Sequence, residues 1–244
     1  MHVAALIPAY NEAATIAAIA RQARAHTGWV IVVDDGSSDG TAAQLAGLDV
    51  TVLRQDFNQG KAAALQRGFV HALEHGAEAV ITLDADGQHD PTDIPRLIEA
   101  GERHPRHIVI GARLANRKRM PRARRFGNAQ ADFWISWAAG YPIRDTQSGF
   151  RLYPSALLHA LLPLDHSRAG FVFESEMLIE AVWRGFYIVA VPIATVYPEQ
   201  ARGSYYRPLH DTARIARMVA RRLLRRRLNP LALLRALGLV PPPD

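Results

Sequence analysis

The chain has 244 residues, of which 49% are hydrophobic and 21% charged, a composition typical of an ordinary globular domain with a sizeable core. The absence of cysteine excludes disulfide bonds and thiolate zinc sites. The sequence has neither a signal peptide nor the run of roughly 18 apolar residues that a membrane-spanning helix needs, so we expect a cytoplasmic protein. The net charge of +6 is uneven, because residues 1–100 are nearly balanced whereas residues 113–125 and 202–227 are rich in arginine.

Short apolar runs alternate with helix-like segments through the first half of the chain. The pattern predicts strands over residues 3–7, 30–33, 50–53, 79–83 and 108–110. It predicts helices over residues 11–25, 38–46, 61–75 and 91–104. Repeated strand–helix units favour an α/β fold with a mostly parallel central sheet and helices on both faces.

Polar clusters follow four of the predicted strands, at the edge of the sheet where ligands of such folds bind. They are Pro8-Ala9-Tyr10-Asn11-Glu12, Asp34-Asp35-Gly36-Ser37-Ser38-Asp39-Gly40-Thr41, Asp84-Ala85-Asp86 and Gly111-Ala112-Arg113. The sequence therefore predicts a site of nucleotide size. A dinucleotide cofactor is disfavoured, because no Gly-x-Gly-x-x-Gly turn follows the first strand. The segment Asn58-Gln59-Gly60-Lys61 begins a helix, where its backbone N–H groups either face an anion or belong to a plain loop.

Two carboxylates and an amide follow the fourth predicted strand within five residues: Asp84, Asp86 and Gln88. Oxygen ligands of this kind suit Mg²⁺ or Mn²⁺, which complete their coordination with water and substrate phosphates. The alternative is a polar turn between a strand and a helix, with Asp90 capping the helix that starts at Pro91.

In combination, four motifs resemble those of glycosyltransferase family 2, in the branch of dolichol-phosphate mannose synthases and related polyprenyl-phosphate glycosyltransferases. Three of them are the clusters that begin at Pro8, Asp34 and Asp84, and the fourth is Asp145-Thr146-Gln147-Ser148-Gly149-Phe150-Arg151. The resemblance covers about residues 1–200. It implies the GT-A fold, a nucleotide-diphosphate-sugar donor, a divalent metal ion (Mg or Mn) and inversion at the sugar.

The resemblance also implies roles for individual residues. The expected substrate contacts are Pro8, Tyr10, Glu12, Asp35, Ala85, Arg113, Arg125 and Arg202, with Arg124 as an alternative to Arg125. The expected metal ligands are Asp84, Asp86 and Gln88, and the expected catalytic residues are Asp86, Arg113, Glu174 and Glu176. Asp39 and Thr41 are expected to cap the next helix rather than to touch a ligand.

The acceptor stays open at this point. A lipid phosphate is already ionised and needs no general base, whereas a hydroxyl acceptor needs one, for which Glu174, Glu176 and Asp145 are the candidates. A lysine is expected after Arg202 and Ser204 in the lipid-phosphate branch, but tyrosine stands there. A non-catalytic sugar-nucleotide-binding protein is a second alternative. Nucleic-acid binding is disfavoured, because no aromatic-bearing motif accompanies the arginines.

The expected organisation is a catalytic domain over residues 1–205, with a nucleotide-binding half (1–115) and an acceptor half (116–205), followed by a basic amphipathic helix and tail over residues 206–244. Within a predicted helix at 209–228, one side carries Arg214, Arg217, Arg221 and Arg225, and another carries Ile215, Met218, Val219 and Leu223. The apolar side either packs on the catalytic domain or, with the arginines, contacts anionic lipid at the cytoplasmic face of a membrane.

Overall fold

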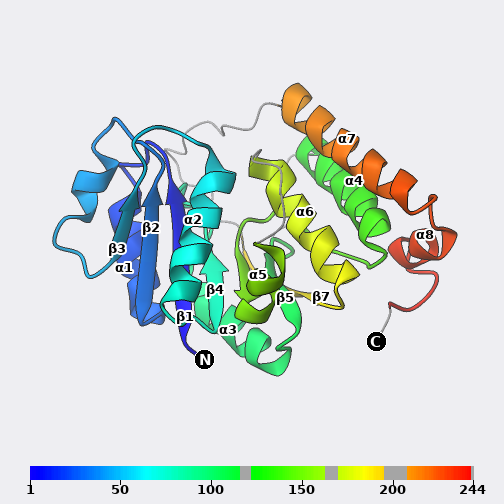
Figure 1. The fold of residues 1–244 in the computed structure, drawn as a ribbon, viewed down its shortest axis with the longest axis horizontal. Coiled ribbons are helices and arrows are strands. Elements are labelled where there is room, and N and C mark those ends of the chain that lie inside the picture. The colour runs from blue at the N-terminus through cyan, green and yellow to red at the C-terminus, as the bar shows by residue number, and fades with distance from the viewer. Residues whose placement is uncertain (116–121, 163–169, 195–207, 243–244) are drawn as a thin grey trace.

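The structure is a computed structural model that describes residues 1–115, 122–162, 170–194 and 208–242. Its centre is a seven-stranded sheet of order β3-β2-β1-β4-β6-β5-β7 (Figure 1). The strands are β1 (Val3–Ala9), β2 (Trp29–Asp34), β3 (Thr51–Arg54), β4 (Ala79–Thr82), β5 (His107–Ala112), β6 (Arg151–Pro154) and β7 (Tyr187–Pro192).

Helices cover both faces of this sheet (Figure 1). One face packs against α1 (Ile16–His26) and α3 (Ile94–Arg103). The other packs against α2 (Lys61–Glu74), α5 (Ser155–Leu161) and α6 (Gly170–Trp183), while α4 (Arg122–Ala139) and α7 (Pro208–Arg225) pack against α6 and against each other. The remaining elements are the short 3₁₀ helices η1 (Thr41–Leu45) and η2 (Pro91–Asp93), and α8 (Pro230–Ala236), which contacts α4. The predicted α/β fold is confirmed.

The apolar runs of the sequence are strands because both of their faces are buried. In β1, Ala4 and Leu6 join one hydrophobic cluster, whereas Ala5 and Ile7 join the cluster on the opposite face. Helix α2 lies so close to β1 that a Cβ at Gly68 would stand 2.2 Å from Leu6 Cδ1. Only glycine permits this approach.

The order of the strands creates the site. β1 pairs in parallel with β2 on one side and with β4 on the other, so the order of the strands reverses at β1. In sheets of this kind, ligands bind outside the carboxyl ends of the strands at the point of reversal. β6 runs antiparallel to β4 and β5, and Arg151 at its start pairs with Thr82 at the end of β4. The segment before β6 therefore lies at the same edge of the sheet as the carboxyl end of β4.

The predicted helix at residues 38–46 is wrong in type and length, since only η1 (Thr41–Leu45) forms, as a 3₁₀ helix. Gly40 adopts a left-handed φ of 87°, and the Asp39 carboxylate accepts hydrogen bonds from the N–H groups of Thr41 (3.0 Å) and Ala13 (3.0 Å). These bonds hold residues 38–40 in a loop. The N-cap position of η1 is Gly40 and has no side-chain cap, so Asp39 binds the loop rather than capping the helix as expected, and Thr41 Oγ1 accepts from Glu12 N (2.8 Å). Asp90 accepts a hydrogen bond from Thr92 N at the start of η2 as predicted.

The C-terminal segment also differs in part from expectation. The predicted apolar stripe of α7 is buried in the main core, as the first interpretation of this helix required: Ile215, Met218, Val219 and Leu223. The region beyond it, expected as a tail, contains the further helix α8, capped by Asn229, whose side-chain oxygen accepts from the N–H groups of Leu231 and Ala232.

Candidate active site

The loops that follow β1 and β2 are fastened to each other. Asn11 N donates to Ser37 Oγ (2.9 Å), and Ser38 N donates to the Asn11 side-chain oxygen (2.9 Å). Asn11 adopts a left-handed φ of 55°, which explains why α1 starts later than the sequence predicted. Pro8, Tyr10 and Glu12, expected to contact the nucleoside, lie half-buried along this fastened edge.

Asp35 organises the loop that leads to α2. Its carboxylate accepts hydrogen bonds from Gln55 Nε2 (2.9 Å), Gln59 N (2.7 Å) and Gly60 N (2.8 Å). Burial raises the pKa of Asp35, and these two backbone N–H groups oppose that rise. The backbone N–H groups of Gln59 and Gly60 thus donate to Asp35 within the protein rather than to a bound ligand. These bonds fix where Lys61 begins α2.

Lys61 joins two carboxylates from distant parts of the chain. Its Nζ lies 2.6 Å from Asp84 Oδ1 and 3.1 Å from Glu174 Oε2. Burial opposes the charge of the lysine, but the two carboxylates raise its pKa, so the ammonium form is held. Burial likewise opposes ionisation of Asp84, yet the Lys61 charge lowers the pKa of that carboxyl to about 2. Both groups are charged at neutral pH.

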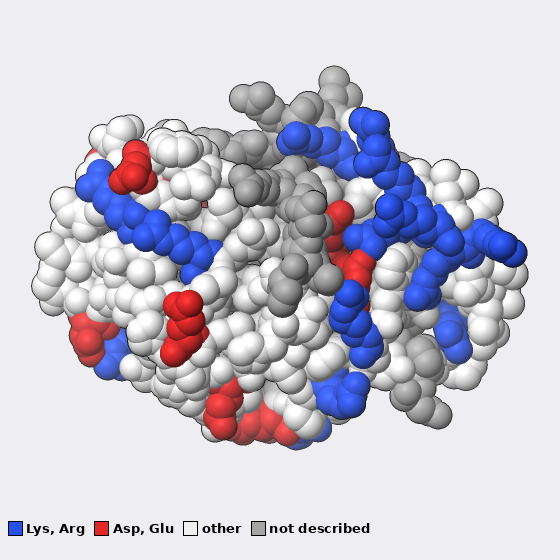
Figure 2. All heavy atoms as spheres, in the orientation of Figure 1, with Lys and Arg blue, Asp and Glu red and all other residues white. Residues whose placement is uncertain are grey.

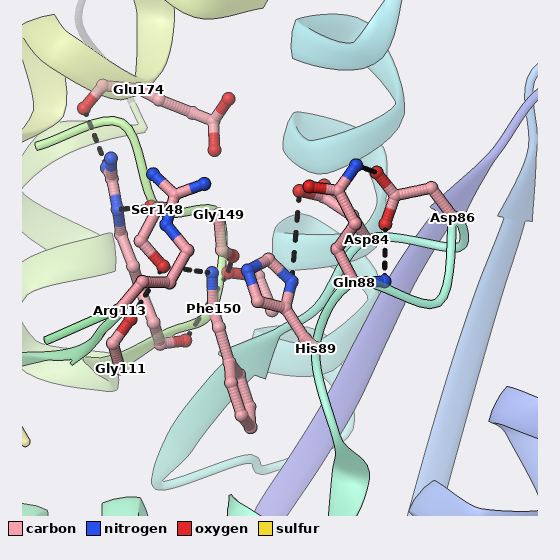
Figure 3. A network of polar contacts seen from close by, with 12 residues as sticks. Asp84, Asp86, Gln88, His89, Gly111, Arg113, Ser148, Gly149, Phe150 and Glu174 are labelled. Atoms are coloured by element: carbon pink, nitrogen blue, oxygen red, sulfur yellow. Dashed lines mark hydrogen bonds and ion pairs between the residues drawn. The ribbon is translucent and has the colours of Figure 1, made fainter. Parts of the chain in front are cut away.

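The turn after β4 carries the side chains of Asp84, Asp86 and Gln88 close together (Figure 3). Gln88 donates from its backbone N to Asp86 Oδ1 (3.0 Å) and from its side-chain Nε2 to Asp86 Oδ2 (2.8 Å). These bonds leave the amide oxygen of Gln88 as the atom to offer a cation. Within the described residues no cluster of three or more acidic or histidine side chains could hold a metal alone. Two carboxylates and an amide nevertheless fit Mg²⁺ or Mn²⁺, which take further ligands from water and phosphate.

His89 is buried directly behind this turn (Figure 3). Its Nδ1 lies 4.0 Å from Asp84 Oδ2, its ring packs at 5.4 Å from that of Phe150, and neither ring nitrogen has a hydrogen-bond partner among the described residues. A buried polar group without a partner is costly, and the ring nitrogens of His89 are polar atoms beside Asp84 that the described residues leave unsatisfied.

The segment before β6 sets the position of Asp84. A Cβ at Gly149 would lie 2.5 Å from Asp84 Oδ2, so this backbone passes the carboxylate at a distance that only glycine allows. The buried guanidinium of Arg151 holds the segment in place, donating to the carbonyl oxygens of Ser148 (2.7 Å), Thr146 (2.8 Å) and Glu174 (2.9 Å).

Arg113 is bound to Asp145 rather than directed alone into the crevice. Its N, Nε and Nη2 donate to the Asp145 carboxylate at 2.7, 2.9 and 2.6 Å. Burial opposes ionisation of Asp145, but these bonds and the arginine charge lower its pKa. This is the arrangement of a structural ion pair, and the phosphate contact expected of Arg113 stays a prediction.

The two acidic residues of α6 point to different places. Glu174 faces Lys61 at the site, whereas Glu176 lies 3.8 Å from Arg222 of α7. Arg125 is half-buried in the first turn of α4, whereas Arg202 and the side chain of Arg124 lie outside the described residues.

Sequence reasoning assigned no role to the side chains of Lys61, His89, Gly149 and Arg151. A signal existed for Lys61, because the chain otherwise uses arginine at every basic position except Lys118. For Gly149 and Arg151 the signal was their place in a recognised motif, but their partners lie on other elements and cannot be read from spacing.

The sheet and the paired-carboxylate turn at its carboxyl edge together define a glycosyltransferase with the GT-A fold. The chain belongs to glycosyltransferase family 2, since the family described as "Glycosyl transferase family 2" matches residues 4–158.

Relatives of known function agree with this assignment. The chain is 32% identical to the UDP-N-acetylglucosamine–dolichyl-phosphate N-acetylglucosaminyltransferase of Methanococcus voltae, over 82% of this chain and 88% of that protein. It is 34% identical to the undecaprenyl-phosphate mannosyltransferase of Micrococcus luteus, over 82% and 85%. The glucosyl-3-phosphoglycerate synthase of Mycobacterium tuberculosis, solved with UDP, matches with a TM-score of 0.66 at 20% identity, over 92% of this chain and 79% of that one. The last likeness establishes the fold alone.

Proposed function

We propose that this glycosyltransferase moves a sugar, with inversion, from a nucleotide-diphosphate donor to a polyprenyl phosphate or a closely similar lipid phosphate. The observation that carries the proposal is the turn of Asp84, Asp86 and Gln88 at the carboxyl edge, beside Lys61 and Glu174. The relatives named for dolichyl- and undecaprenyl-phosphate substrates support the acceptor class.

The turn is proposed to hold a divalent cation through Asp84, Asp86 and the amide oxygen of Gln88. Such an ion supplies neutralisation of the charge that develops on the leaving nucleoside diphosphate. A solved neighbour of the same fold contains Mn²⁺ and UDP, which supports the choice of ligand class. The protein residues do the rest: the loops after β1 and β2, fastened by Asn11, would receive the nucleoside, with Pro8, Tyr10 and Glu12 as its contacts.

The ion pairs of the candidate bases favour a phosphate acceptor over a hydroxyl. A general base is effective when it is not already bound to a cation. Each of the three candidates forms an ion pair with a basic partner: Glu174 with Lys61, Glu176 with Arg222, and Asp145 with Arg113. A phosphate oxygen is ionised at neutral pH and attacks without a base.

A transfer assay tests the proposal. Purified protein is incubated with radiolabelled UDP- and GDP-sugars, Mn²⁺ and either a polyprenyl phosphate or the matching polyprenol. We expect a labelled lipid only with the phosphate, formed only when a divalent ion is present and removed by chelation. Transfer to the polyprenol at the same rate would favour the hydroxyl acceptor, and metal-dependent donor binding without any transfer would favour the non-catalytic alternative.

We further propose that the C-terminal region meets an anionic membrane surface. Figure 2 shows basic side chains gathered over α7, where the exposed arginines are Arg214, Arg217, Arg221 and Arg225. The apolar stripe of α7 is used in the core, so lipid contact would come instead from exposed leucines that follow it: Leu228, Leu231, Leu234, Leu237 and Leu239. No helix in the part of the chain that the structure describes is long and apolar enough to cross a membrane.

A further inference from the structure

Lys61 joins carboxylates from two different elements of the chain. It stands at the start of α2, and its ammonium group binds Asp84, which follows β4, and Glu174, which belongs to α6. The Glu174 side chain is 8% exposed and those of Lys61 and Asp84 are 25% and 27% exposed, so both ion pairs are largely shielded from water. Shielding strengthens a charge interaction and makes it insensitive to salt.

Lys61 occupies the carboxylate oxygen of Asp84 that a divalent cation would also need. Lys61 Nζ lies 2.6 Å from Asp84 Oδ1, which is the contact distance of a charge-assisted hydrogen bond. A divalent cation on the same carboxylate oxygen would bring two positive centres into contact. Cation and ammonium therefore compete for Asp84, unless negative charge arrives to separate them, and the diphosphate of the donor supplies that charge.

We propose that Lys61 is a positioning residue that holds Asp84 in place of the divalent cation, and that it is displaced from Asp84 when cation and donor diphosphate bind together. This inference rests on the proposed function. Lys61 stays paired with Glu174 after displacement, which keeps that carboxylate neutralised near the acceptor. The cation alone then binds weakly, and bound nucleotide raises the affinity of the protein for the cation. Because coupling between two binding sites is reciprocal, the cation raises the affinity for the nucleotide by the same factor.

The test is Mn²⁺ binding without any turnover, followed by the electron paramagnetic resonance signal of the free ion. Lys61→Met should bind Mn²⁺ about tenfold or more tightly than wild type, because it removes the ammonium group that contacts Asp84 Oδ1 at 2.6 Å and competes with the ion. Saturating UDP or GDP should tighten Mn²⁺ binding less in this variant than in wild type. Arg67→Met is the matched control, because Arg67 lies on the same helix and donates to the Arg54 carbonyl, away from the carboxylates.

Removing the lysine leaves Glu174 buried without that cation, and the single variant is therefore paired with Lys61→Met/Glu174→Gln, which removes both charges. Tighter Mn²⁺ binding in either folded variant supports the inference. Mn²⁺ binding that is equal to wild type or weaker in both, or absent from every protein, overturns it. The transfer assay separately decides the proposed function, because wild-type turnover does not depend on the outcome for the variants.

Discussion

Replacing Gly149 with alanine tests whether the segment before β6 positions Asp84. The added Cβ would lie 2.5 Å from Asp84 Oδ2, and ordinary contact begins at 3.4 Å, so the carboxylate or the backbone must shift by about 0.9 Å (3.4 − 2.5). Gly149 is not among the residues with positive φ, so alanine suits its backbone and the effect is one of space alone. A displacement of about 1 Å in a reacting constellation costs on the order of 10²-fold in rate.

The assay is steady-state transfer at saturating Mn²⁺, with thermal unfolding measured in parallel. We expect kcat to fall about 100-fold for Gly149→Ala, while overpacking costs about 1–3 kcal/mol of stability. Gly127→Ala is the control, because nothing lies within 4 Å of a Cβ at that position. A Gly149→Ala enzyme with wild-type kcat would refute the argument that this glycine sets the place of Asp84.

Three further substitutions and one surface change follow from the same structure. Asp86→Ala should abolish transfer without lowering the melting temperature, because the residue lies in a surface turn; wild-type turnover would remove the cation site. Arg113→Ala should destabilise the fold by roughly 3–5 kcal/mol, since it removes the cation and two of the three donors of residue 113 from the buried Asp145 carboxylate, and an unchanged urea midpoint would argue against that. Since the pKa of Asp84 is lowered from an ordinary 3.8 to about 2, the contribution of this group to stability is complete above about pH 4 and is lost as the pH falls towards 2. In urea unfolding, Asp84→Asn should therefore lose less of its free energy of unfolding than wild type does over the same fall in pH. Leu231→Ser/Leu237→Ser should lose co-sedimentation with anionic vesicles while neutral vesicles bind neither protein, and equal binding to both vesicle types would count against the membrane surface.

The sequence predicted the alternating half of the fold well, because buried parallel strands are continuous apolar runs. It failed at residues 38–46, where helix-like spacing met a local competitor: Asp39 binds the N–H groups of Thr41 and Ala13 and holds the chain in a loop. Beyond residue 115 the helix at residues 209–228 was predicted, but the elements between it and β5 were not. The strand β6 owes its place to pairing with β4 and β5, which is a property of the whole sheet rather than of its four residues.

The candidate site, like the fold, was predicted from the sequence only in part. Residues that carry a motif in one short stretch, such as Asp84, Asp86 and Gln88, lie together as predicted, and their cation-binding role stays a prediction. What spacing does not reveal is which charges neutralise one another. The Lys61 pairs with Asp84 and Glu174 span 23 and 113 positions of the chain (84 − 61 and 174 − 61), and their existence follows only from the packing of α2 against β1 and α6.

The balance of charge around Asp84 gives an independent reason for a divalent cation. The acids described around Asp84 outnumber the permanent cations. The acids are Asp84, Asp86, Glu174, Asp145 and Asp132, which accepts from the backbone N of Asp145, and the cations are Lys61, Arg113 and Arg151. Both proposed substrates are anions that must approach to bonding distance, and an excess of carboxylates opposes their approach. An ion of charge +2 would offset that excess. The acids of this turn would then serve binding, because they recruit positive charge to the place where the anions must bind.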